Sequence, residues 1–455
     1  MEKRLRIVII GCGKVGTSIA RELNAENHDI SVVDNDRKAV ARLSETLDVL
    51  GVEGNGATYE VLAEAGAETA DLVIAATARD EVNLYACLMA RAAGVPHTIA
   101  RVRSPEYTDD LYRVKDQLRL SMSINPELTE AIEISRLLRF SGALEIDSFA
   151  KGAVELIKVL VPEKSPVIGK RISQIDTLGG RIRVCTVERA NEVYIANGDT
   201  EIKAGDKVTV VAKPEIATRF FKKSGINIGR SKDVFLLGGG KVSFYLAQRL
   251  LKAGANVRII ERNLERCQEL AEALHDAMII HGDCMDQELL LSEGIERADG
   301  VAALMDYDEE NILISLYIKE VSKAKIITKI NNESFDNIIG NLGLECVINP
   351  KTLTGEYIAR YIRAMQNSLG SNVETLYRLH EDRVEALEFR AKQSSNVIDT
   401  PLSDLNLKDD LQIICINRNG KIILPQGGDS IMAGDSVVVI TKHKGLSDLN
   451  DILKR

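Results

Sequence analysis

The sequence contains two copies of one long unit, and this internal repeat limits the possible folds more than any other feature. The segment IVIIGCGKVGTSIARELN, which begins at Ile7, is matched by VFLLGGGKVSFYLAQRLL, which begins at Val234. Further along, the run DEVN at Asp80–Asn83 recurs as DEEN 228 residues later. A smaller unit is also duplicated, since IKAGDKVTVVAK (202–213) returns as IMAGDSVVVITK (431–442). The 455 residues therefore hold two large and two small units in alternation.

The larger unit alternates short strands rich in Val, Ile and Leu with helical stretches. In the first copy we expect strands near 5–10, 30–34, 49–52, 72–77 and 97–102. Apolar strands that alternate with helices indicate a parallel sheet covered on both faces. We therefore predict an α/β protein: a tandem repeat of a Rossmann-like, doubly wound parallel sheet, each copy followed by a small α+β lobe. We place the Rossmann-like domains at 1–124 and 230–350, and the lobes at 143–225 and 371–455.

Composition excludes several classes of protein. Hydrophobic residues make up 45% and charged residues 27%, as in ordinary soluble globular chains. No apolar run approaches the ~18 residues that cross a bilayer, so we expect no membrane span. A net charge of −9, few aromatic residues and no Trp argue against a nucleic-acid partner. Seven scattered cysteines without a CxxC pair suit a reducing cytoplasm.

A glycine-rich turn follows the first predicted strand. It has the sequence GCGKVG, a complete GxGxxG, made by Gly11, Cys12, Gly13, Lys14, Val15 and Gly16. The first glycine permits the tight turn, the second lets a pyrophosphate approach the backbone, and the third lets the helix pack on the strand. Asp34, 23 residues beyond Gly11, would bind an adenosine ribose and repel a ribose 2′-phosphate. NAD(H), ADP or ATP is expected rather than NADP, unless the glycines only shape the turn.

The second copy carries an altered form of this turn. It is made by Gly238, Gly239, Gly240, Lys241, Val242 and Ser243. Serine replaces the third glycine, while Glu261 keeps the acid at the end of the next strand. Because the third glycine serves helix packing more than phosphate approach, a second nucleotide site and a degenerate site both stay open.

Other candidates lie where strands end, because ligands of open α/β sheets bind at the carboxyl edge. Thr77 and Ala78 follow the fourth strand and could contact the adenosine. Arg101 ends the fifth strand and could donate to a phosphate, and Lys329 is its equivalent. An exposed salt bridge is the alternative for Arg101. Asn55 could meet the base or simply form a turn.

Three residues of metal-binding types occur close together in the second copy, namely His275, His281 and Cys284. Their spacing fits no zinc pattern, so we expect ordinary surface and core roles.

These features occur in the same order in both copies, and in this the chain resembles the TrkA family. Members of that family are the RCK (KTN) regulatory subunits of bacterial and archaeal Trk potassium-uptake systems. The resemblance covers essentially the whole chain. It rests on the first glycine-rich turn, Asp34, the Ala-Thr pair that ends at Thr77, the DExN runs, Arg101, the two Asn-Pro pairs (125–126 and 349–350) and the two AGD turns. Two departures are Asn55, where many relatives carry Asp, and Ser243.

The resemblance implies a non-enzymatic, cytoplasmic regulator held at the inner face of the membrane by its partner. It implies a homotetrameric ring beneath a potassium-translocating subunit of the TrkH or TrkG kind. NAD(H) and possibly ADP or ATP would bind Gly11–Val15, Asp34, Thr77-Ala78 and Arg101, with a second possible set at Gly238–Val242 and Glu261.

Two other functions share the glycine-rich turn. An NAD-dependent dehydrogenase would need a proton-handling residue and a substrate lobe beside the nicotinamide, but the six histidines are scattered and the lobes are small and duplicated. A structural scaffold without nucleotide binding is disfavoured by the intact first GxGxxG.

Overall fold

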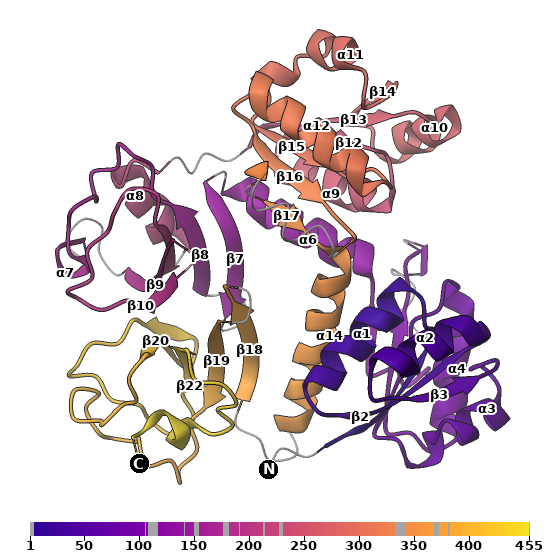
Figure 1. Ribbon diagram of the computed structural model, residues 1–455, viewed down its shortest axis with the longest axis horizontal. Coiled ribbons are helices and arrows are strands. Elements are labelled where there is room, and N and C mark those ends of the chain that lie inside the picture. Colours follow the sequence, from indigo (N-terminus) through magenta and orange to yellow (C-terminus); the bar gives the residue numbers. More distant parts are fainter. Residues whose placement is uncertain are drawn as a thin grey trace.

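In the computed structural model, each copy of the repeat forms a parallel sheet flanked by helices and then a smaller antiparallel sheet (Figure 1). The predicted fold class, a tandem Rossmann-like unit with a small α+β lobe after each copy, is confirmed. The structure describes residues 4–104, 106–107, 117–140, 142–149, 154–175, 182–190, 192–212, 214–226, 231–332, 342–344, 346–367, 373–380 and 383–454.

The first parallel sheet has the strand order β3-β2-β1-β4-β5-β6. Its strands are β1 (Arg6–Ile10), β2 (Asp29–Asp34), β3 (Leu50–Glu53), β4 (Leu72–Ala75), β5 (His97–Arg101) and β6 (Met122–Ile124). The flanking helices are α1 (Lys14–Ala25), α2 (Arg37–Thr46), α3 (Tyr59–Glu64), η1 (Ala67–Thr69) and α4 (Asp80–Ala92). The sequence analysis missed β6, because three residues are too few to show a strand period. Every pairing is parallel, so all six strands end at one edge.

The second parallel sheet repeats this order as β14-β13-β12-β15-β16-β17. Its strands are β12 (Asp233–Leu237), β13 (Asn256–Glu261), β14 (Met278–His281), β15 (Gly300–Ala303), β16 (Lys325–Lys329) and β17 (Val347–Ile348). The flanking helices are α9 (Lys241–Lys252), α10 (Leu264–Ala273), α11 (Gln287–Ser292), η4 (Ile295–Arg297) and α12 (Asp308–Val321).

Each Rossmann-like unit is covered by a helix that the other copy supplies. Helix α6 (Pro126–Arg139) leaves the first unit and packs against α9, whereas α14 (Pro350–Asn367) leaves the second and packs against α1 (Figure 1). A Cβ on Gly355 would lie 3.3 Å from Ser18 Oγ, so glycine lets α14 approach α1 closely. The apolar core around β1 and β2 includes Ile358, Ala359, Ile362 and Met365 of α14.

The small lobes are five-stranded antiparallel sheets of the same order. The first has β7 (Ala143–Phe149), β8 (Val154–Leu160), β9 (Arg183–Arg189), β10 (Glu192–Ile195) and β11 (Lys207–Ala212), with α7 (Ile172–Ile175) and α8 (Pro214–Lys223). The second has β18 (Val373–Leu379), β19 (Val384–Arg390), β20 (Leu411–Arg418), β21 (Lys421–Ile423) and β22 (Ser436–Thr441), with η6 (Leu449–Ile452).

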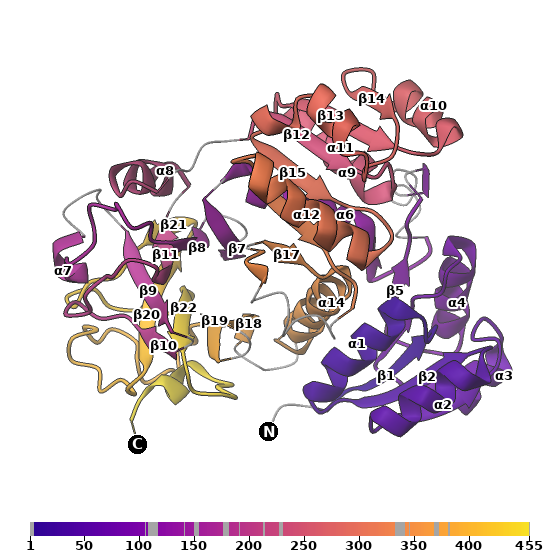
Figure 2. The ribbon, with the colours of Figure 1, turned by 45° about the horizontal axis from the view of Figure 1, so that its top comes forward.

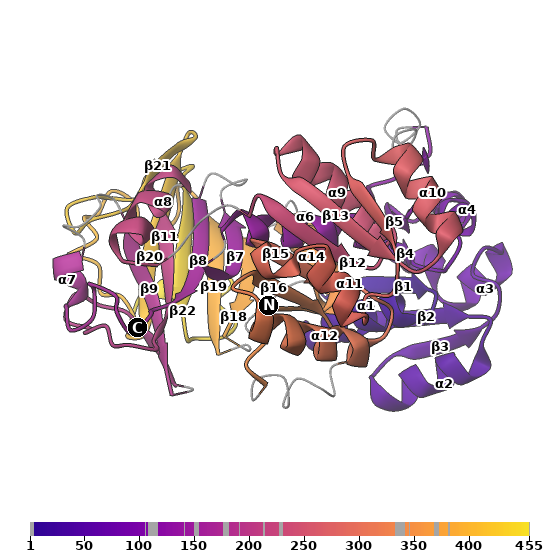
Figure 3. The same cartoon turned by 90° about the horizontal axis from the view of Figure 1, so that it is seen from above.

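The two small lobes pack face to face on one side of the molecule, with the Rossmann-like units on the other (Figures 2 and 3). The rings of Phe149 and Tyr377 lie 4.4 Å apart across this contact. The ring nitrogens of His380 lie 2.8 Å from Thr186 Oγ1 and 2.9 Å from Glu188 Oε2. The His380 hydrogen bond holds the pKa of Glu188 well below its ordinary value. The lobes thus share an apolar core and a buried polar link.

The duplicated AGD turn has a structural cause. Gly205 has a φ of +78°, which favours glycine. The buried Asp206 that follows accepts two hydrogen bonds from Arg189, both at 2.7 Å. In the second lobe, Asp435 and Arg418 repeat the pair at 2.8 and 3.0 Å. Bidentate arginine–carboxylate pairs are among the strongest hydrogen-bonded contacts in proteins, so each AGD turn is fixed to its sheet.

We expect Asp206→Asn to destabilise the first lobe by about 2 kcal/mol, because the buried carboxylate that accepts both hydrogen bonds of the Arg189 fork is replaced by a neutral amide. The midpoint of urea unfolding measures the effect. Asp199→Asn is the matched control, since its ion pair with Arg171 is highly exposed and contributes little. Equal shifts in the two variants would contradict the assigned role.

Candidate functional site

The three glycines of the first turn have different structural roles. Gly11 has a φ of +105°, and a Cβ there would lie 3.0 Å from the Thr77 backbone nitrogen. A Cβ on Gly16 would fall 1.8 Å from the Gly11 carbonyl oxygen, so this glycine serves packing. A Cβ on Gly13 would meet no atom within 4 Å. The turn therefore leaves open space above Gly13, where α1 begins without a side-chain cap for its first N–H groups.

Asp34, at the end of β2, is held beside this space. Its Oδ2 accepts a hydrogen bond from the Cys12 N–H at 2.6 Å, and its Oδ1 accepts one from the Asp36 N–H at 2.9 Å. Each carboxylate oxygen keeps a lone pair for a further donor. Burial, followed by the charge of Asp34, raises the pKa of the Cys12 thiol to about 12, so Cys12 is a neutral turn residue and no nucleophile.

A cleft of about 890 Å³ lies in front of the turn and is bordered by both copies of the repeat. Its lining from the first copy includes the predicted residues Gly11, Gly13, Lys14, Val15, Asp34, Thr77, Ala78 and Arg101. The second copy contributes Gly240, Lys241, Val242 and Lys329. Cys12 is buried outside the lining, and Gly238, Gly239 and Glu261 line a separate cavity. The structure thus brings together residues that the sequence analysis had assigned to two sites.

Asn83 fixes the strand ends that face the cleft. Its Oδ1 accepts from the Thr77 N–H at 2.8 Å, and its Nδ2 donates to the Arg101 carbonyl at 2.9 Å. Asn311 makes the equivalent bond to the Lys329 carbonyl at 3.0 Å. The duplicated DExN run therefore joins neighbouring strands at the edge where the candidate site lies.

Two carboxylates on α6 form part of the cleft wall, and the sequence analysis missed both. Glu127 Oε1 lies 3.5 Å from Arg101 Nη2, and Glu130 exposes 3% of its surface. Burial raises the pKa of Glu130 to about 7, while the charge of Lys329 opposes that rise. Among the described residues, Glu130 Oε1, Glu127 Oε2 and Arg101 Nε have no hydrogen-bond partner. The wall thus holds buried polar atoms whose hydrogen-bonding capacity is unused among the described residues.

A comparison of the two copies of the repeat could have pointed to these two acids. Each Asn-Pro pair starts a helix, but Glu127 and Glu130 follow the first pair, whereas Lys351 and Thr354 stand at their places after the second. A pair of acids three residues apart lies on one helix face.

The second turn faces its own cavity of about 370 Å³. Glu261 Oε2 accepts from the Gly239 N–H at 2.7 Å, as Asp34 does in the first copy. Ser243 fits at the third position, and its hydroxyl donates to the Gly238 carbonyl. Arg266 Nε donates to the Gly239 carbonyl at 2.8 Å. The geometry of the turn is therefore kept, with an arginine across its entrance.

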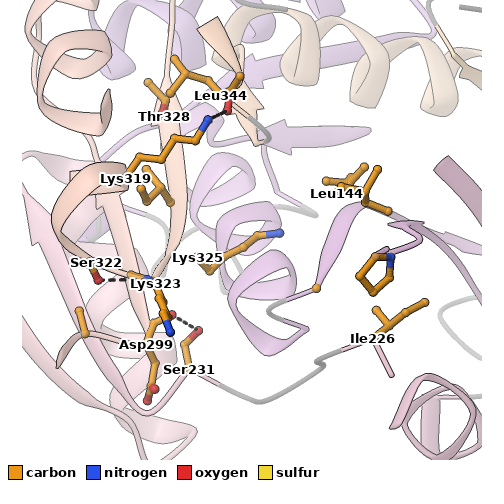
Figure 4. A pocket seen from close by; sticks show the side chains of 17 residues that line it. Leu144, Ile226, Ser231, Asp299, Lys319, Ser322, Lys323, Lys325, Thr328 and Leu344 are labelled. Carbon is orange, nitrogen blue, oxygen red and sulfur yellow. Dashed lines mark hydrogen bonds between the residues drawn. The ribbon is translucent and has the colours of Figure 1, made fainter. Parts of the chain in front are cut away.

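A further cavity of about 580 Å³ lies at the opposite edge of the second sheet, beside β7 (Figure 4). Lys325 extends from the start of β16 and donates to the Ala143 carbonyl, and Lys319 Nζ donates to the Gly343 carbonyl at 2.8 Å. The described lining includes none of the predicted site residues. Lys325 thus joins the second Rossmann-like unit to β7 of the first small lobe, whereas the Lys319 bond stays within the second unit.

His275, His281 and Cys284, which were weighed as metal ligands, are either exposed or engaged in contacts with backbone carbonyls. His281 Nε2 lies 3.1 Å from the Arg262 carbonyl, Cys284 Sγ donates to the Ile260 carbonyl, and His275 is exposed. The described residues hold no group of three His, Cys, Asp or Glu that could bind a metal ion. In the same part of the chain, no helix is long and apolar enough to cross a membrane.

Solved structures define the class of the protein. The GsuK RCK domain aligns over 96% of this chain and 92% of its own, with 17% identity and a TM-score of 0.63. The GsuK channel bound to NAD aligns over 97% of this chain and 77% of its own, with the same identity and TM-score. Fold and duplicated turns therefore define a tandem protein of the RCK fold.

The sequence matches then give the family. The TrkA-N domain matches residues 7–120 and 234–350, and the TrkA-C domain matches 156–225 and 386–454. The chain belongs to the TrkA family. Trk system potassium uptake protein TrkA homolog 1 of Methanosarcina mazei is 32% identical, with 99% of this chain and 100% of the relative covered. The TrkA homolog of Archaeoglobus fulgidus is 33% identical, with 99% of this chain and 100% of the relative covered. TrkA of Azorhizobium caulinodans is 30% identical, with 96% of this chain and 95% of the relative covered.

We expect the Glu130 carboxyl to titrate near pH 7, because burial disfavours its charged form. NMR of protein with 13C-labelled Glu, compared with Glu130→Gln, measures this midpoint. Lys329→Met should raise the pKa by up to about one unit and Glu127→Gln should lower it, because the first removes a cation and the second an anion. A midpoint near the ordinary value of 4.5 would contradict the burial argument.

The raised pKa of Glu130 also makes the stability of the fold depend on pH. A carboxyl whose folded-state pKa is raised stabilises the fold below its unfolded pKa of about 4.5 and loses that contribution as pH rises through 7.

Proposed function

We propose that the protein is a nucleotide-sensing regulatory subunit that gates a membrane potassium-uptake protein of the Trk kind by binding NAD(H), ADP or ATP. The observation that carries the proposal is the open space above Gly13, beside Asp34, in a cleft bordered by both Rossmann-like units. The names of its relatives place them in Trk potassium uptake. Structures of the GsuK channel bound to NAD, and of GsuK bound to ADP, support a nucleotide as the ligand of this fold.

The first turn suits the phosphates of such a ligand. The N–H groups of Gly13, Lys14 and Val15 start α1 with no side-chain cap, and the helix dipole adds a positive potential there. The free lone pairs of Asp34 would accept the ribose hydroxyls, and its charge would repel a 2′-phosphate. Thr77 and Ala78 would lie beside the adenosine, and Arg101 would approach the phosphates from β5.

Gating would follow from the position of the cleft between the two units. Lys241 and Lys329 of the second unit line the same space as Gly13, so a bound anion contacts both units at once. Nucleotides that differ in charge and length would favour different separations of the units, and only such differential affinity shifts a conformational equilibrium. Couplings of this kind are typically about 1–3 kcal/mol per site, so several sites in a ring would bias a gate strongly.

The assembly we propose is a homotetramer in the cytoplasm, held at the membrane through a TrkH- or TrkG-like potassium-translocating subunit. The TrkA-family membership of the chain supports this partner.

A dehydrogenase is the alternative. Proton transfer beside a nicotinamide usually requires His, Tyr or Lys. The described lining of the cleft contains no His or Tyr. Of its four lysines, Lys329 and Lys351 donate to the carbonyls of Leu304 and Asn331, and Lys14 and Lys241 start α1 and α9 at the two glycine-rich turns. The cleft therefore favours binding over catalysis, and purified protein should not oxidise NADH with a panel of small carbonyl compounds.

We expect Gly13→Asp to weaken NADH binding at least ~100-fold, because a carboxylate beside a pyrophosphate costs a few kcal/mol. The fold should survive, since a side chain at Gly13 meets no atom within 4 Å. Isothermal titration calorimetry measures binding, and circular dichroism checks the fold. Gly198→Asp makes the same chemical change on a distant exposed loop and should bind normally. Retained NADH binding by folded Gly13→Asp protein would refute the site.

The purified protein should retain a potassium-translocating subunit from detergent-solubilised membranes of its source. We expect NADH or ATP to change that retention, or potassium flux in vesicles that contain both proteins. The Gly13→Asp protein should still bind the partner but lose the nucleotide response. If no membrane protein is retained with or without nucleotide, the regulator is the wrong reading and the enzyme panel takes priority.

A further inference from the structure

The two glycine-rich turns face spaces of opposite charge. The cleft before the first turn is lined by the basic residues Lys14, Arg79, Arg101, Lys241, Lys329 and Lys351 and by the acidic residues Asp34, Glu127, Glu130 and Asp306. The cavity before the second turn is lined by two arginines, Arg262 and Arg266, and by four acids, Glu261, Asp283, Asp306 and Glu310. Positive charge is therefore in excess in the first space and negative charge in the second.

The difference is concentrated where phosphates would lie. Asp306 stands at the place of Ala78, just beyond the end of β15, and lines the second cavity together with Gly240. Lys329, the equivalent of Arg101, donates to the Leu304 carbonyl at 3.0 Å and lines the first cleft, not the second cavity. A phosphate in the second cavity would meet the Asp306 carboxylate and would lack the cation that Arg101 supplies in the first cleft, where Asp306 is outweighed by six basic side chains.

The surroundings of Cys284 also indicate this negative potential. Burial, together with the charges of Glu261, Asp283 and Glu310, raises the pKa of its thiol to about 12.

The nucleoside end of the second cavity is intact. The two oxygens of Glu261 accept from the N–H groups of Gly239 and Asn263, both at 2.7 Å, which leaves a lone pair on each for ribose hydroxyls. The Arg266 guanidinium is held on the Gly239 carbonyl and offers a planar cation that stacks well on an aromatic base. The cavity, about 370 Å³ against about 890 Å³, is also the smaller of the two.

We propose that the second cavity takes an adenine nucleoside without phosphate groups, of which adenosine is the simplest, and rejects NAD(H), ADP and ATP. The inference rests on the proposed function only in assigning phosphate-bearing nucleotides to the first cleft. One chain would then bind two different adenine ligands at its two related turns.

Calorimetry with the full-length protein tests the inference. NADH and ADP should each bind at one site per chain, and adenosine titrated into NADH-saturated protein should give a second binding event that Glu261→Gln abolishes. Exchanging the residue types at the equivalent positions 78 and 306 should reverse the difference in ADP affinity between the two sites. Asp306→Ala should tighten ADP binding at the second site at least tenfold, and Ala78→Asp should weaken it at the first site by a similar factor. Both positions are exposed, so the variants should fold, and circular dichroism verifies this.

Two equivalent ADP sites in the unmodified protein would overturn the inference, as would NADH-saturated protein that takes up no adenosine. If NADH does not bind at all, the proposed function fails instead. Adenosine binding, and its loss in Glu261→Gln, still decides what the second cavity holds.

Discussion

The exchange of α6 and α14 between the two Rossmann-like units is the contact on which the other features depend. Each helix starts at the carboxyl edge of its own sheet and packs against the first helix of the other unit. The apolar residues of α14 complete the core around β1 and β2, so neither unit buries its surface alone. The same exchange turns the carboxyl edges of the two sheets toward one another, which is why Gly13 and Lys241 border a single cleft.

Within that cleft, the residues that fix the backbone differ from the residues whose polar atoms lack hydrogen-bond partners. The glycine turn and Asn83 fix the backbone, through hydrogen bonds that leave little freedom at the strand ends. Other residues that line the cleft, Arg101, Glu127 and Glu130, hold polar atoms that lack partners among the described residues. Buried polar groups without partners are costly, so a bound ligand or ordered water would be stabilised there. A fixed turn together with polar atoms that lack partners is consistent with the proposal that ligand charge sets how closely the units approach.

The sequence was sufficient for features that depend on local pattern. The repeat, the doubly wound order and the turn and packing roles of Gly11 and Gly16 follow from strand period, turn chemistry and spacing. Contacts between distant segments were not accessible in this way. Glu127 appeared only as the residue after a helix-starting proline, and its approach to Arg101 depends on how α6 leaves the sheet. Likewise, the sequence placed Lys329 at a strand end as the equivalent of Arg101, but only the packing of the units turns it toward the first cleft.

Because the two copies are fused in one chain, the residues on the two sides of the cleft need not be identical. Two identical subunits related by a two-fold axis must present the same residue on both sides of their contact, so every substitution appears twice. Here Glu127 stands in the first turn of one exchanged helix and Lys351 at the equivalent position of the other, and no homodimer of single copies could hold these opposite charges at equivalent positions. Duplication followed by fusion thus lets the halves of one cleft diverge independently, as the subunits of a heterodimer do.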